Sequence, residues 1–157
     1  NQTIENSFSI NVATNYEGIL YDDAPLVQAV KSVLNAENCP EAEVDLILVD
    51  DEFLRELKFE YFNQDVYTDV ISFRLNPESE DRAEGEIYIS LDRAAEQALE
   101  YEVTADIEIL RLAIHGTLHL LGYEDDTEEK KADMASLENR HLQQFSEPIV
   151  IQSIPEE

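Results

Sequence analysis

The segment from residue 105 to residue 121 constrains the fold of this chain more than any other part of its sequence. Apolar side chains fall on nearly every side of a helix through this segment, which leaves the helix almost no polar face. Such a helix has to be buried at the centre of a fold. His115 and His119 interrupt its apolar surface, so their presence needs a chemical or a structural reason.

The rest of the chain is apolar enough to surround such a helix. It has 157 residues, of which 43% are apolar, and we expect a single domain over residues 1–157. Cys39 is the one cysteine, which excludes a disulfide scaffold. No apolar run approaches the roughly 20 residues that cross a bilayer, and the polar first residues do not form a signal peptide. We therefore expect a soluble, cytoplasmic protein.

The chain is strongly acidic. Its 36 acidic and 10 basic residues give a formal net charge of −26. Tight, sequence-blind binding to nucleic acid normally relies on Lys and Arg, so this charge argues against it. It favours solubility, bound cations or basic protein partners.

The spacing of apolar residues predicts an α+β, or mixed α/β, fold. Strands are expected over residues 8–12, 43–49, 69–75 and 86–90, with a polar connection over 76–85. Besides the central segment, helices are expected over residues 24–35, from 51 onward, and over 92–102 and 128–144. Asp23 is the expected N-cap of the first helix. The prediction is a small sheet of about four strands covered by helices, with the central helix carrying metal ligands.

His115 and His119 are the candidate metal ligands. Residues four apart on a helix lie on one side, so both imidazoles can contact one ion. Gly122 follows directly and suits the left-handed residue that ends a helix. The turn over residues 123–126 then brings carboxylates back toward the histidines. Two imidazoles and one carboxylate would leave one position open, as in catalytic zinc sites.

Two observations limit this interpretation. Histidines on an apolar helix can also be core residues with satisfied hydrogen bonds. In the H-E-x-x-H metalloproteases a Glu follows the first His, whereas Gly116 stands at that position here. If the site is catalytic, its base comes from elsewhere.

Residues 115–125 read H-G-T-L-H-L-L-G-Y-E-D, which resembles the signature H-G-x-L-H-L-x-G-Y-D-H of the YbeY family. These are bacterial metal-dependent endoribonucleases that act in rRNA maturation. Two further segments are similar: residues 68–73, T-D-V-I-S-F, to the family's T-D-V-L-S-F, and residues 85–90, G-E-I-Y-I-S, to its G-D-I-x-I-S. Their order and spacing also fit, so the resemblance covers nearly the whole chain.

The resemblance implies a zinc-dependent hydrolase that cleaves single-stranded RNA, with roles in rRNA maturation and ribosome quality control. One zinc ion per chain would be held by His115, His119 and Asp125. Asp125 stands where the family has its third histidine, and an oxygen ligand there hardens the site and broadens the choice of metal. Glu124 stands where the family has Asp and is the candidate for proton transfer.

Substrate contacts are expected at Arg74 and Ser72. The family carries an arginine shortly before T-D-V, and Phe62 stands at the matching position. We expect Arg74 to compensate by holding a substrate phosphate; the alternative is a solvated arginine at a strand end. Ser72 would face the cleft by resemblance, although a buried, hydrogen-bonded hydroxyl explains it equally.

Other functions remain open at this point. A non-catalytic ribosome-assembly factor, with a structural metal or none, would use the acidity to bind basic ribosomal proteins. A peptide hydrolase is the third possibility, and Gly116 counts against it. His141 is the remaining histidine; we interpret it as a surface or helix-packing residue, although it is the one imidazole that could replace Asp125 as a ligand.

Overall fold

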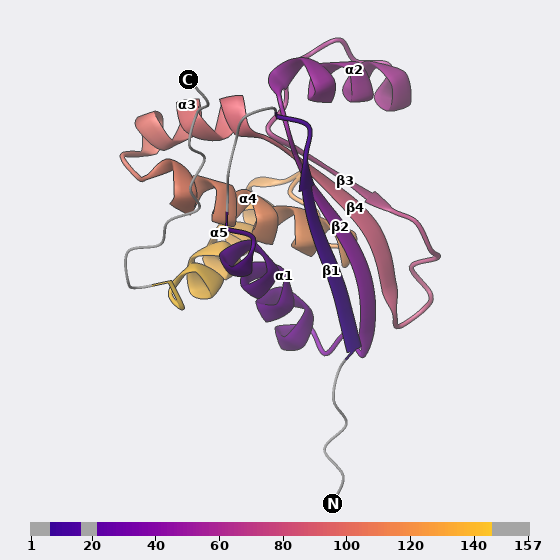
Figure 1. Cartoon of the computed structure of the whole chain (residues 1–157). Helices are drawn as coiled ribbons and strands as arrows, with labels where there is room; N and C mark the ends of the chain where they lie inside the picture. Colours follow the sequence, from indigo (N-terminus) through magenta and orange to yellow (C-terminus); the bar gives the residue numbers. More distant parts are fainter. Residues whose placement is uncertain (1–6, 17–21, 146–157) are drawn as a thin grey trace, which may run out of the picture.

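The computed structural model describes residues 7–16 and 22–145 and has the predicted α+β fold (Figure 1). Its strands are β1 (Ser7–Thr14), β2 (Glu41–Val49), β3 (Val70–Arg74) and β4 (Ala83–Ser90). Its helices are α1 (Ala24–Ala36), α2 (Asp51–Phe62), α3 (Leu91–Tyr101), α4 (Ala105–Leu120) and α5 (Glu128–Leu142). Every predicted element is present, and β4 begins within the stretch that was expected to be a polar connection. In the part of the chain described, no helix is long and apolar enough to cross a membrane.

The strands form one sheet in the order β1-β2-β4-β3, in which β3 alone runs antiparallel to its neighbour. Helices α1 and α4 pack on one face of this sheet, and α3 and α5 pack against α4 (Figure 1). Alternate residues of β2 and β4, such as Leu46 and Ile87, point into this layer and are fully buried. Helix α4 contacts three other helices and two strands, which confirms its predicted central position.

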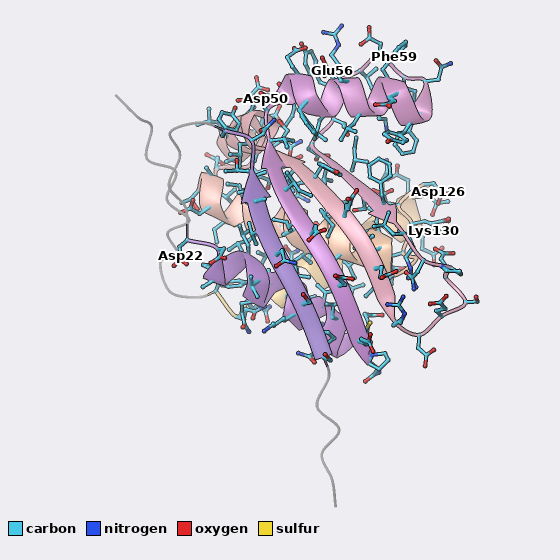
Figure 2. All side chains as sticks on the ribbon, turned by 45° about the vertical axis from the view of Figure 1, so that its right-hand side comes forward. Asp22, Asp50, Glu56, Phe59, Asp126 and Lys130 are labelled. Atoms are coloured by element: carbon cyan, nitrogen blue, oxygen red, sulfur yellow. The ribbon has the colours of Figure 1, made fainter. Side chains whose placement is uncertain are left out.

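The opposite face of the sheet is covered only at one end. Helix α2 packs there, over a small apolar cluster that contains Val49, Leu54 and Ile71. Figure 2 looks onto this face, where no helix lies over most of β1 and β2. Glu43 and Asp45 project from β2 there, and register with Glu84 and Glu86 of β4. The uncovered face is therefore acidic.

The N-cap position expected for Asp23 is confirmed, but its side chain does not cap the helix. Asp23 occupies the N-cap position of α1, but its side chain accepts no hydrogen bond from the helix. Its backbone is already helical, with φ −80° and ψ −15°, whereas a capping residue normally adopts an extended conformation. Asp22 takes over instead, because its Oδ1 accepts from the Ala24 N–H at 3.0 Å.

Candidate metal centre and the adjoining cleft

The C-terminal half of α4 and the turn after it bring three potential ligands together. His115 Nε2 lies 3.0 Å from His119 Nε2 and 3.5 Å from Asp125 Oδ2, and His119 Nε2 lies 3.7 Å from Asp125 Oδ1. All three residues are partly exposed at the protein surface. They form a group that could hold a metal ion, composed of the residues that the sequence singled out.

The second nitrogen of each imidazole has its own partner. His119 Nδ1 lies 2.9 Å from the Tyr123 carbonyl oxygen, which can only accept, so Nδ1 carries the proton. His115 Nδ1 lies 2.6 Å from Glu138 Oε2 and donates to this carboxylate. In a neutral ring of this tautomer Nε2 has a free lone pair, and the two Nε2 atoms face each other at 3.0 Å.

This arrangement fits a tetrahedral cation. Lone pairs 3.0 Å apart repel each other unless a proton or a cation lies between them. Zinc bonds of about 2.0–2.1 Å place tetrahedral ligands about 3.3 Å apart, close to the spacing of these three atoms. Three protein ligands would leave the fourth position of a tetrahedral ion to water or substrate.

Glu138 connects His115 to a buried ionic network. Glu138 is only 5% exposed, and its Oε1 accepts from Arg111 Nη1 at 2.8 Å. Arg111 also binds Glu108, which is 1% exposed. Burial raises the pKa of the Glu138 carboxyl, but the hydrogen bonds from His115 and Arg111 outweigh burial and lower it. Glu138 thus remains an anion that orients the His115 ring.

The turn after α4 fixes Asp125. Gly122 has φ +99°, the left-handed conformation predicted for it, and the Tyr123 N–H donates to the Leu118 carbonyl at 3.1 Å. Glu124 comes next and lines the same cleft as His119. Its Oε2 accepts from Lys130 Nζ at 3.1 Å, so the carboxylate is paired but exposed.

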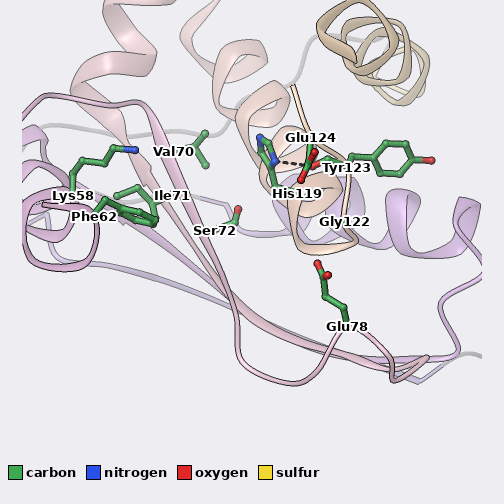
Figure 3. A pocket seen from close by; sticks show the side chains of 10 residues that line it. All are labelled: Lys58, Phe62, Val70, Ile71, Ser72, Glu78, His119, Gly122, Tyr123 and Glu124. Carbon is green, nitrogen blue, oxygen red and sulfur yellow. Dashed lines mark hydrogen bonds between the residues drawn. The ribbon is translucent and has the colours of Figure 1, made fainter. Parts of the chain in front are cut away.

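A cleft of about 400 Å³ lies beside His119 (Figure 3). Helix α2 contributes Lys58 and Phe62 to its lining, and β3 contributes Val70, Ile71 and Ser72. The turn after α4 and the Glu78 side chain form the rest of its wall. The cleft therefore extends from the candidate metal centre to α2.

Ser72 and Arg74, the two predicted substrate contacts, both bond to the protein itself. Ser72 lines the cleft, and its Oγ donates to the Gly116 carbonyl at 2.8 Å. The Arg74 guanidinium lies inside the β3–β4 connection, where it donates to the Asn76 side chain at 2.7 Å and to the Leu120 carbonyl at 2.9 Å. Its Nη2 donates to three further carbonyls. These contacts favour a structural role for Arg74, and a phosphate contact would require some of them to break.

His141 lies away from this centre. It is 6% exposed, and its Nδ1 lies 2.7 Å from Ser32 Oγ of α1. The group of possible ligands does not include it. Its contacts favour the helix-packing interpretation over the surface one.

The fold and these residues together define a class: an α+β protein with a possible three-ligand metal centre at the edge of an open cleft. Comparison with known proteins narrows the class. The family model described as "Endoribonuclease YbeY" matches residues 12–146, so the chain belongs to the YbeY family.

Individual relatives agree with the family model. Three proteins named endoribonuclease YbeY are similar over most of their length. That of Chloroherpeton thalassium is 42% identical, covering 73% of this chain and 80% of its own. That of Flavobacterium psychrophilum is 36% identical, and the match covers 87% of this chain and 95% of the relative. That of Desulforamulus reducens is 44% identical, and the match covers 76% of this chain and 84% of the relative. The solution structure of Thermotoga maritima TM1509 has a TM-score of 0.56 and 27% identity, and 87% of this chain and 91% of that one are covered.

Several residues of the site, among them Glu138 and Lys58, were not singled out from the sequence. Glu138 lies on α5, and nothing local marks it as the partner of His115. Lys58 could have been found, because it precedes Phe62 by one helical turn and such residues share a helix face.

Proposed function

We propose that this protein is a metal-dependent endoribonuclease that hydrolyses phosphodiester bonds of single-stranded RNA. One zinc ion would be held by His115, His119 and Asp125. The observation that carries the proposal is the pair of Nε2 atoms that lie 3.0 Å apart beside the Asp125 carboxylate, at the edge of the cleft. Membership of a family whose proteins are named endoribonucleases supports the choice of RNA as substrate.

The residues around the candidate metal centre have different roles in this proposal. A bound divalent cation would act as a Lewis acid on a phosphodiester oxygen. Glu138 and the Tyr123 carbonyl hold the two imidazoles in the tautomer that presents Nε2. Glu124 lines the cleft and is exposed to solvent, so it can exchange a proton with a group bound there. Ser72 and Arg74 remain the proposed substrate contacts, of which Ser72 is the better placed.

The resemblance to the family supports ribosomal RNA as the substrate and the cytoplasm as the place of action. Ribosome assembly also offers basic proteins as partners for an acidic molecule. A non-catalytic assembly factor with a structural metal fits less well. Structural zinc sites are usually closed by four protein ligands, and the described part of the chain provides a group of three.

The test combines metal content with RNA cleavage. Protein purified without added metal or chelator is analysed by mass spectrometry, beside Asp125→Ala and the control Asp126→Ala. Asp126 lies in the same turn, pairs with Lys130 and is outside the group of three ligands, so the control removes an equal charge and leaves those ligands in place. Each protein is then incubated with a single-stranded RNA, with and without zinc.

We expect about one zinc ion per chain and zinc-dependent cleavage in the wild type and in Asp126→Ala, with both strongly reduced in Asp125→Ala. A wild type that takes up no metal when zinc is offered would contradict the proposal. So would cleavage that survives both chelation and the Asp125 substitution.

A further inference from the structure

The cleft contains one cation with no anionic partner. Lys58 lines it together with two carboxylates, Glu78 and Glu124. Within residues 7–16 and 22–145, Lys58 forms no ion pair, whereas Lys130 nearby binds both Glu124 and Asp126. Among the residues that line the cleft, Lys58 is the single Lys or Arg. Its position suits an anionic ligand.

An aromatic ring holds this cation in place. Lys58 Nζ lies 4.7 Å from the centroid of the Phe62 ring, within the range of a cation–π contact. The Phe62 ring is itself stacked on Phe73, with centroids 6.0 Å apart and an interplanar angle of 16°. This contact orients the ammonium without neutralising its charge, so its donors stay available.

The path from Lys58 to the metal centre is continuous. Figure 3 shows the Lys58 side chain extending along the cleft in the direction of Val70 and His119. Both Lys58 and His119 line the same cavity, which holds about 400 Å³. An extended RNA strand places successive phosphates along such a cleft, so a strand cleaved at the metal centre would pass Lys58.

We propose that Lys58, positioned by Phe62, binds a backbone phosphate of the RNA next to the one that is cleaved. The inference rests on the proposed function and adds the contact that fixes the strand in the cleft.

The test is RNA binding by zinc-loaded protein, followed by fluorescence anisotropy, with the RNA checked to be intact after each titration. Lys58→Met removes the charge, and Lys58→Arg keeps it. Lys31→Met is the matched control, because it removes the same charge from α1, which does not line the cleft. Salt is varied between 100 and 300 mM, where screening leaves mainly local contacts.

We expect Lys58→Met to weaken binding about threefold to tenfold and to make the slope of log K against log salt less negative by about 0.7, the value for one phosphate contact on a single strand. Lys58→Arg and Lys31→Met should stay within twofold of the wild type. A Lys58→Met protein with wild-type affinity and slope would overturn the inference, as would an equal loss in Lys31→Met.

Cleavage is measured in parallel to separate this inference from the proposed function. A wild type that binds RNA through Lys58 but never cleaves it would overturn the nuclease and support the phosphate contact. A wild type that cleaves RNA but does not need Lys58 for binding would support the nuclease and overturn the phosphate contact. Failure of the wild type to bind single-stranded RNA at all would overturn both.

Discussion

At the scale of single residues, the metal centre is defined by which atom of each imidazole is free. The Tyr123 carbonyl and the Glu138 carboxylate accept from the two Nδ1 atoms, and this leaves both Nε2 atoms as ligands. The two partners differ in strength, because a carboxylate makes His115 a better electron donor than a carbonyl makes His119. Glu138 should therefore influence metal affinity although it lies outside the ligand set.

Glu138→Gln tests this influence. The amide oxygen can still accept from His115 Nδ1, but the negative charge is lost and the amide nitrogen cannot accept from Arg111. We therefore expect zinc affinity to fall about tenfold, the low end for partners of metal ligands. Competition with a chromogenic chelator measures the affinity directly. Glu129→Gln, on the exposed start of the same helix, is the control and should bind zinc like the wild type. Unchanged zinc affinity in Glu138→Gln would mean that the negative charge of Glu138 does not contribute to metal binding.

At the scale of elements, the site depends on how closely α4 approaches the sheet. A Cβ atom at Gly116 would lie 2.6 Å from Ile87 Cγ2 and 3.0 Å from Ser72 Oγ. A side chain at this position, such as the glutamate of the metalloproteases, would require these neighbours to shift. The same close approach lets the Ser72 hydroxyl reach the Gly116 carbonyl.

Gly116→Ala should consequently destabilise the fold. The added methyl group has to push α4 away from β3 and β4, and overpacking of this kind costs about 1–3 kcal/mol. Urea unfolding gives the free energy of unfolding, with Ser136→Ala on the exposed side of α5 as the control that should change it by less than about 0.5 kcal/mol. If Gly116→Ala unfolds at the wild-type midpoint, the helix has room that the structure does not show.

The packing of α1 on α5 should respond to pH through His141. Burial lowers the pKa of this imidazole, and nearby Arg140 lowers it further, while Glu37 raises it. The unfolded chain therefore takes up a proton near pH 6.5, before the folded one does. Below that pH the unfolded state binds more protons, so this contribution to stability is present above pH 6.5 and is lost as pH falls toward the folded pKa.

His141→Gln removes this titration. We expect the free energy of unfolding of the wild type, minus that of the variant, to shrink between pH 7.5 and pH 5, by about 1.4 kcal/mol for each unit by which the pKa is depressed. Denaturant unfolding of both proteins at several pH values gives the difference. A difference that stays constant, or grows on acidification, would mean that folding does not favour the neutral ring.

The sequence predicted best what is encoded locally. The elements follow from apolar spacing along each segment, and His115, His119 and Asp125 meet because they lie on one helix and the turn that follows it. The His115–Glu138 contact joins residues 23 positions apart, through the packing of α4 on α5, so no local pattern contains it. The structural role of Arg74 could not be predicted for a similar reason. The carbonyls that accept its hydrogen bonds come close only when the β3–β4 connection folds back over it.

At the scale of the whole molecule, the negative net charge of the protein repels RNA, the substrate proposed for its site. The formal net charge is −26, and the uncovered sheet face places Glu43 opposite Glu84 and Asp45 opposite Glu86. Single-stranded RNA approaching from solution meets this field before it reaches the cleft. Association should therefore be limited by repulsion, which is the reverse of the electrostatic attraction that speeds basic RNA-binding proteins.

This repulsion predicts an inverted salt dependence for the rate of association. The Debye length falls from about 30 Å at 0.01 M salt to about 8 Å at 0.15 M, so added salt screens the long-range repulsion while contacts inside the cleft persist. We expect the association rate constant for a single-stranded RNA, measured by stopped-flow fluorescence, to rise severalfold over this range. An oligonucleotide analogue with an uncharged backbone is the control and should associate at a rate that salt hardly changes. A rate constant that falls as salt is added would show that the cleft's local field, with Lys58 in it, governs the approach of RNA in spite of the net charge.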